Sequence, residues 1–123
     1  MVMVDRIAGI DGAVTITTFL VAADNVFVED GFFREPGLIE NMAQSAAAGA
    51  GAKPGLEGKP APVGFIGGIR NLKIDALPPA GSELTTKITV QHEVFNATIV
   101  QGEVFLNDRC IASCELKIFI INS

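Results

Sequence analysis

Two polar residues interrupt an alanine-rich stretch and are the first candidates for chemistry. Glu40 and Gln44 stand four positions apart in PGLIENMAQSAAAGA at residues 36–50, so they share one face if the stretch is helical. A carboxylate among apolar residues must be paired, neutral or open to a cavity, and one that opens on a cavity can act as a general acid or base. Gln44 could orient it or bind a substrate amide. The alternatives are an exposed acid that complements the helix dipole and a glutamine satisfied by backbone groups.

Backbone groups at the start of the same helix are a second candidate. Pro36 suits a first helical turn, where its missing N–H is not needed. Free N–H groups at a helix N-terminus can stabilise negative charge on a carbonyl oxygen, and Gly37 would let that oxygen approach closely. Asn41 and Ser45 form another polar pair, rotated by about 100° around the helix, which we expect to face a subunit interface.

The sequence holds one histidine and two cysteines. His92 shares its strand parity with Ile88 and Val90, so we expect a core or interface histidine; a role in proton transfer would require it to reach Glu40. Cys110 and Cys114 would lie about 13 Å apart on one face of a strand, beyond the reach of a disulfide. We expect both as small core residues, and no metal site.

The elements that must position these residues follow from composition and periodicity. We expect strands over 13–21, 25–28, 63–74, 84–94, 97–107 and 109–120, a helix over 36–50 and an exposed loop over 52–61. The last three strands alternate apolar and polar residues, which is typical of an antiparallel sheet with one face on a core. Turn residues separate them at 78–81, 95–96 and 107–108. One apolar helix against a long antiparallel sheet predicts an α+β domain over residues 1–123.

Composition excludes several classes of protein. Apolar residues make up 49% of the 123 positions and charged residues only 19%, which excludes intrinsic disorder. A net charge of −5 with no Trp or Tyr argues against a nucleic-acid binder. No apolar run reaches the ~18 residues of a membrane span, and Asp5 and Arg6 interrupt any signal sequence. We expect a cytoplasmic protein that binds neither nucleic acid nor membrane.

The order of elements resembles the hot-dog fold, in which a long antiparallel sheet wraps one central hydrophobic helix. The local sequence is similar to that of the bacterial 3-hydroxyacyl-acyl-carrier-protein dehydratases. The matching segments are VDRI at 4–7, NVFV at 25–28, PG at 36–37, ENMAQ at 40–44, GGIRNLK at 67–73 and PAGSEL at 79–84. They follow the family's order over nearly the whole chain.

The resemblance implies a catalytic pair, a loop histidine and a helix carboxylate, acting across a dimer interface. Glu40 matches the carboxylate. The family's histidine falls at Gly31, next to Asp30, and the chain from Gly31 to Glu40 is about five residues shorter than the family's loop. Half of the pair is therefore missing, and Asp30 could replace the histidine only if the short loop brings it near Glu40.

The resemblance also implies a reaction and partners. The reaction would be removal of water from a 3-hydroxyacyl thioester to give the trans-2-enoyl form, with no cofactor because the thioester itself acidifies the α-proton. The acyl carrier would be acyl carrier protein or coenzyme A, and Arg70 and Lys73 match the strand that receives it, unless they are merely solvated. Gly37 and Gln44, with Gly31 and Asp30, are the expected substrate contacts.

Three functions stay open. The chain could be a weak dehydratase alone, a non-catalytic subunit that completes a heterodimer with a histidine-bearing hot-dog partner, or an acyl thioesterase that uses a helix carboxylate. We expect a dimer in each case, homomeric or heteromeric, because a single layer leaves a sheet edge unpaired.

Overall fold

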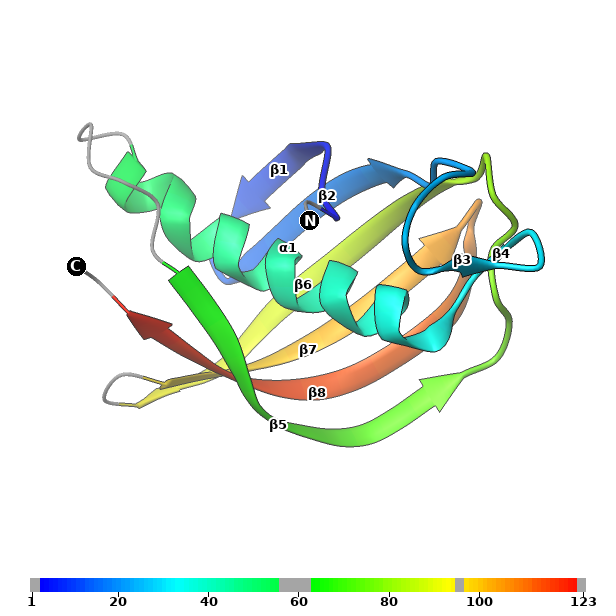
Figure 1. The fold of residues 1–123 in the computed structure, drawn as a ribbon. Coiled ribbons are helices and arrows are strands. Elements are labelled where there is room, and N and C mark those ends of the chain that lie inside the picture. The colour runs from blue at the N-terminus through cyan, green and yellow to red at the C-terminus, as the bar shows by residue number, and fades with distance from the viewer. Residues whose placement is uncertain (1–2, 56–62, 95–96, 122–123) are drawn as a thin grey trace.

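One long helix lies in the concave face of a six-stranded antiparallel sheet (Figure 1). The computed structural model describes residues 3–55, 63–94 and 97–121. The sheet order is β1-β2-β6-β7-β8-β5, and a two-stranded ribbon, β3-β4, precedes the helix. The elements are β1 (Arg6–Asp11), β2 (Val14–Leu20), β3 (Val28–Glu29), β4 (Phe32–Phe33), α1 (Glu35–Gly55), β5 (Val63–Ile74), β6 (Glu83–Val94), β7 (Ala97–Leu106) and β8 (Arg109–Ile121). This is the predicted hot-dog arrangement.

The core fills the space between α1 and the sheet. Leu38 and Met42 on the helix are fully buried, as are the inward residues of the strands. Those strand residues include Leu84, Ile88, Val100, Val104, Cys114, Leu116 and Ile118. They occupy the even positions that the alternating pattern assigned to the core, so that expectation is confirmed for the middle of β6, β7 and β8.

Two β-bulges break this alternation near strand ends. Between Val90 and His92 the register with β7 shifts by one residue, and His92 is exposed rather than in the core of the protomer. A second bulge turns Ile111 inward, so Cys110 is only half-buried while Cys114 is buried as expected. The expected core position of His92 is wrong; an interface position stays a prediction.

The segment before the helix is a tight hairpin instead of the predicted strand over 25–28. Asp30 and Gly31 both have positive φ, 54° and 84°, and join the paired residues Glu29 and Phe32. Two central residues with positive φ define the hairpin turn that Asp-Gly sequences favour. Val26 and Phe27 form a turn before it. The hairpin projects beyond the N-terminal end of α1 (Figure 1).

The helix is longer than expected, because Gly49 and Gly51 do not end it. A Cβ atom at Gly49 would lie 2.3 Å from Oγ1 of Thr15, so glycine here permits close contact between α1 and β2. The expected loop over 52–61 overlaps the helix up to Gly55, and its remainder lies outside the described residues, as does the turn over 95–96. Among the described residues, no helix combines the length and hydropathy needed to cross a membrane.

Candidate active site

Glu40 lies on the second turn of α1 and is directed away from the core. Its side chain is half-buried, as are Ala43 and Ala47, whereas Asn41 and Met42 beside it are fully buried. Pro36, one turn earlier on the same face, is exposed. Glu40 is therefore partly accessible from the outer face of the helix.

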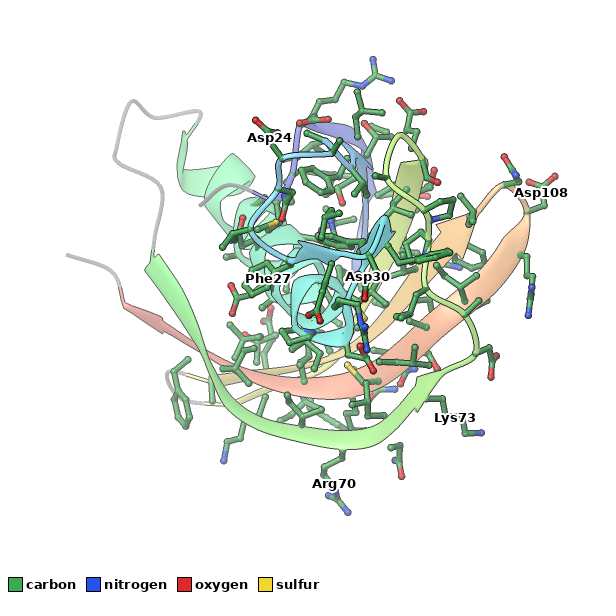
Figure 2. The ribbon with its side chains drawn as sticks, turned by 45° about the vertical axis from the view of Figure 1, so that its right-hand side comes forward. Asp24, Phe27, Asp30, Arg70, Lys73 and Asp108 are labelled. Carbon is green, nitrogen blue, oxygen red and sulfur yellow. The ribbon has the colours of Figure 1, made fainter. Side chains whose placement is uncertain are left out.

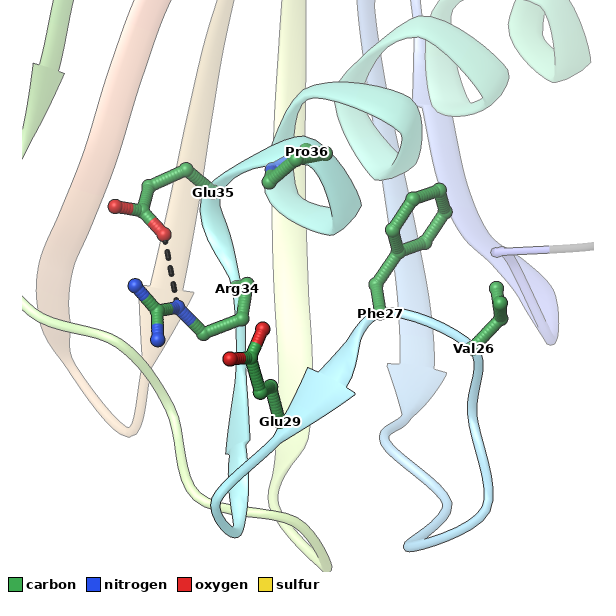
Figure 3. A pocket seen from close by; sticks show the side chains of 6 residues that line it. All are labelled: Val26, Phe27, Glu29, Arg34, Glu35 and Pro36. Atoms are coloured by element: carbon green, nitrogen blue, oxygen red, sulfur yellow. Dashed lines mark hydrogen bonds and ion pairs between the residues drawn. The ribbon is translucent and has the colours of Figure 1, made fainter.

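A pocket of about 240 Å³ lies at the N-terminal end of this face (Figure 3). It is lined by Val26, Phe27, Glu29, Arg34, Glu35 and Pro36. The charged side chains stand on one side of it, and Phe27 and Val26 stand on the other. Pro36 belongs to both the pocket and the outer face, whereas Glu40 lies one turn further along that face and does not line the pocket.

Arg34 and Glu35 form an ion pair at the wall of the pocket, with 3.0 Å between Nε and Oε1. The hydrogen bond and charge of Glu35 raise the pKa of Arg34 above its ordinary value. The pKa of Glu35 lies below its ordinary value, first because its own backbone N–H bonds to the carboxylate and then because Arg34 donates to it. Both side chains are solvated, so the pair orients Arg34 rather than stabilising the fold.

Gly37 allows the hairpin to pack on the first turn of α1. A Cβ atom there would lie 2.5 Å from the ring of Phe33 and 2.8 Å from Cβ of Phe27. Its N–H donates to the carbonyl of Arg34, at 3.0 Å. A contact between Gly37 and substrate stays a prediction. For its N–H to bind a substrate carbonyl, the hydrogen bond to Arg34 would have to break.

Gln44 holds the N-terminal segment of the chain. Its Oε1 accepts a hydrogen bond from the backbone N–H of Met3, at 2.6 Å, and Asn41 Nδ2 donates to the carbonyl of the same residue, at 2.6 Å. Met3 is itself fully buried. The side chain of Gln44 thus has a partner within the protomer, as one alternative supposed, and its contact with substrate stays a prediction.

Asn41 and Ser45 face the sheet, which corrects the expectation that they face a subunit interface. Both are fully buried. Asn41 Oδ1 accepts from the hydroxyl of Thr86 in β6, and the hydroxyls of Ser45 and Thr17 are 2.7 Å apart. From sequence alone, polar residues on an apolar helix are expected to face outward. The threonines that satisfy Asn41 and Ser45 in the core lie 45 and 28 residues away in sequence, so no local pattern reveals them.

Asp30 lies at the turn of the hairpin before the start of α1, whereas Glu40 lies on the second turn of the helix. Asp30 and Gly31 are exposed at the tip, and the carbonyl of Gly31 accepts from the N–H of Ala80 in the neighbouring loop. The tip is thus tied to the chain before β6, beyond the end of the helix. Any role of Asp30 or Gly31 in binding substrate stays a prediction.

His92 is far from Glu40 within the protomer. Asn41, the neighbour of Glu40, contacts Thr86 in β6. From Thr86, β6 runs towards the C-terminal half of α1. This direction follows from Thr15, which pairs with Ile88 of β6 and lies against Gly49 of the helix. His92 lies six residues beyond Thr86, which is about 20 Å along a strand. The two groups therefore cannot form a catalytic pair in one chain.

Arg70 and Lys73 project from the edge strand β5 away from α1 (Figure 2). Both are exposed, and the strand bulges between them at Asn71, whose φ is 55°. Contact with a carrier protein stays a prediction.

The cysteines do not form a reactive or metal-binding cluster in the part of the chain that the structure describes. Both are free, and burial raises the pKa of the Cys114 thiol to about 11. Burial, followed by the charge of Glu103, also raises the pKa of Cys110. No group of three or more His, Cys, Asp or Glu side chains there could hold a metal ion.

Sequence reasoning missed the pocket, because its walls come from a turn, a hairpin and the helix start. The Asp-Gly pair at 30–31, between VE and FF, is a hairpin signal that could have predicted the tight turn. Nothing in the residue types alone marks Val26 or Glu29 as pocket residues.

Comparison with known proteins decides the family. The sequence model of a family described as ApeP dehydratase matches residues 1–122. The chain belongs to the ApeP dehydratase family. Among curated proteins no sequence match was found.

The fold of this ApeP-family chain is similar to that of several solved structures. The dehydratase heterocomplex ApeI:P from Xenorhabdus doucetiae matches with a TM-score of 0.88 at 18% identity, over 99% of this chain and 84% of that chain. The Escherichia coli PaaI protein of the phenylacetic acid degradation operon matches with a TM-score of 0.73 at 14% identity, over 96% and 80%. A hypothetical thioesterase from Streptococcus pneumoniae has the same TM-score at 13% identity, over 96% and 91%. The fold and the family together make this ApeP-family chain a dehydratase-like hot-dog protein.

Proposed function

We propose that the chain is one subunit of a heteromeric hot-dog dehydratase that acts on 3-hydroxyacyl thioesters. In this proposal Glu40 supplies one catalytic group and a histidine-bearing partner subunit supplies the other. The proposal is supported by the family, and by the likeness to a dehydratase structure that is a complex of two proteins.

Elimination of water requires two proton transfers. A base removes the proton on the carbon next to the thioester carbonyl, and the electrons of that C–H bond form the C=C bond. The C–O bond at the third carbon breaks, and an acid protonates the departing hydroxyl to give water. One carboxyl group serves one of these roles at a time, so Glu40 needs a second group, and a missing general acid or base typically costs ~10²–10⁴-fold in rate.

The position of Glu40 relative to His92 is the observation that carries the proposal. Glu40 is half-buried on the outer face of α1, where a second subunit can approach it. The only histidine of the sequence, His92, lies about 20 Å along β6 from Thr86, which contacts the neighbour of Glu40, Asn41. His92 is therefore not the second proton-transfer group, and in this proposal that group comes from the partner subunit.

The pocket beside Pro36 is the proposed site for the thioester end of the substrate. Phe27 and Val26 would contact the acyl carbons, and Arg34 retains N–H donors for a carbonyl oxygen. Gly37, Gln44, Asp30 and Gly31 are secondary candidates for substrate contact. Acyl carrier protein or coenzyme A would deliver the substrate, with Arg70 and Lys73 as candidate contacts for the carrier.

Mass spectrometry of a 3-hydroxyacyl carrier-protein substrate tests the proposal. The purified chain is incubated alone, with a candidate histidine-bearing hot-dog partner, and as the variants Glu40→Gln and His92→Gln in the same mixture. We expect loss of water only in the mixture, a fall of ~10²-fold or more with Glu40→Gln, and no change with His92→Gln.

Three other outcomes would replace the proposal. Rapid dehydration by the chain alone, lost in Glu40→Gln, would make it a histidine-independent dehydratase. Release of free thiol without loss of water would make it a thioesterase in which Glu40 activates water. An active mixture that is indifferent to Glu40→Gln would leave the chain a non-catalytic subunit.

A further inference from the structure

The helix that carries Glu40 has no clear apolar stripe to set its rotation about its own axis. Leu38, Met42 and Ala46 are buried against the sheet, and Ala43 packs on the edge of the same core. Ile39 and Ala47 are also apolar and are half-buried outside it. A surface helix is normally oriented because only one of its faces is apolar. Here a turn of about 100° would exchange one set of apolar side chains for another.

The polar residues of α1 distinguish these orientations. Asn41 joins two separate parts of the chain, because it donates to the carbonyl of Met3 and accepts from the hydroxyl of Thr86. Ser45 donates to the backbone carbonyl of Asn41, and its oxygen lies 2.7 Å from that of Thr17 in β2. All four side chains that form these contacts on helix and sheet are fully buried.

These contacts are satisfied in one rotation only. Among the described residues, every buried side-chain nitrogen and oxygen has a hydrogen-bond partner. Turning the helix would separate Asn41 from Thr86 and Ser45 from Thr17, and would leave polar groups unpaired in the core, which is costly. Buried polar pairs of this kind can specify one packing arrangement where apolar contacts alone permit several.

We propose that Asn41 and Ser45 are positioning residues that fix the rotation of α1 and so direct Glu40 to the outer face beside the pocket. Glu40 directly precedes Asn41, so the direction of one side chain sets that of the other. The importance of this placement for catalysis rests on the proposed function, but the rotation itself does not.

The test replaces each polar pair by apolar residues of similar size. The variants are Ser45→Ala with Thr17→Val, Asn41→Leu with Thr86→Val, and all four together, each made in the full chain. Two-dimensional amide NMR spectra show whether the backbone amides of α1 give one set of signals, for one helix orientation, or several. Both partners of each pair are removed, but Asn41→Leu also takes the donor from the Met3 carbonyl, so the combined variant should lose stability as well. In its folded population we expect extra or exchange-broadened signals for α1, β2 and β6.

A matched control keeps the hydroxyl. Thr17→Ser retains the bond to Ser45 and should give one sharp set of signals. A single set of α1 signals with unchanged shifts in the combined variant would overturn the proposal. If the combined variant fails to fold, the same criterion applies to each pair alone, where a single unchanged set in both would equally overturn it.

Activity distinguishes this proposal from the proposed function. In an active mixture with the partner, Ser45→Ala with Thr17→Val should lower kcat at least about tenfold, while Thr17→Ser alone should leave it unchanged. If the NMR spectra change as expected but no mixture dehydrates the substrate, the positioning role stands and the proposed function fails.

Discussion

The hydroxyl of Thr86 donates a hydrogen bond to the side-chain oxygen of Asn41 across 45 residues of sequence, with both side chains fully buried. This bond joins the central helix to β6 at Asn41, the residue that directly follows Glu40. Asn41 therefore contributes both to the stability of the fold and to the placement of Glu40.

Replacing Asn41 by alanine should therefore destabilise the protein strongly. The substitution removes the partner of the Thr86 hydroxyl and of the Met3 carbonyl, and an orphaned buried group costs about 1–3 kcal/mol. We expect the free energy of unfolding in urea to fall by about 2–4 kcal/mol. Gln91→Ala, at an exposed position of β6, is the control and should change it by less than about 0.5 kcal/mol. Equal effects from the two substitutions would contradict the buried role of Asn41.

Gly37→Ala should distort the junction between the hairpin and α1. The new methyl group would lie 2.5 Å from the ring of Phe33, which is itself fully buried and has little room to move. Overpacking of this kind typically costs about 1–3 kcal/mol, which thermal unfolding would detect. Gly68→Ala is the matched control, because a Cβ atom there would meet no neighbouring atom within 4 Å. Gly37→Ala should cost less in a Phe33→Leu background than in the parent protein, because the ring is one of the two groups that the methyl group would meet.

His92→Gln should leave the free energy of unfolding within about 0.5 kcal/mol of the parent value, since the side chain is exposed beyond a bulge. This holds for the isolated protomer. Urea unfolding at low protein concentration is the measurement. A larger loss that grows with protein concentration would instead indicate that His92 lies in a subunit interface.

The two thiols should differ in their rate of alkylation. Burial raises the pKa of Cys114 to about 11, so at pH 8 only about one molecule in a thousand carries the reactive thiolate. Its rate should rise about tenfold per pH unit up to that pKa. Cys110 is half-buried and should react first, which peptide mass spectrometry after iodoacetamide treatment would show. Faster modification of Cys114 in the folded protein would mean that the core opens readily.

The parts of the fold that repeat regularly could be predicted from the sequence. The alternation in β6, β7 and β8 identified the inward residues, because a strand places every second side chain on one face. The alternation does not reveal the bulges that expose His92 and turn Ile111 inward. The end of α1 lies beyond the predicted one because tertiary contact with Thr15 favours glycine at position 49 inside the helix.

The candidate site was predictable in part. Glu40 could be placed on the helix from its neighbours, and its likeness to a family position added a role. The pocket could not be predicted, since Val26, Arg34 and Pro36 meet only after the hairpin folds. The direction of Asn41 depended on a threonine that no local pattern links to it.

The pairing of β5 with β8 has a consequence for how the chain folds as it is made. Ile74 pairs with Ala112 and Val63 with Ile121, and β8 is the only neighbour of β5 in the described sheet. Pairing between such distant segments is slow, because a long loop must close before any contact forms. On the ribosome β5 emerges from the exit tunnel before β8 does, so for that interval the strand around Ile69 has no native strand neighbour. We expect nascent chains in which β5 but not β8 has emerged to aggregate or to engage chaperones, whereas chains in which β8 has also emerged escape both.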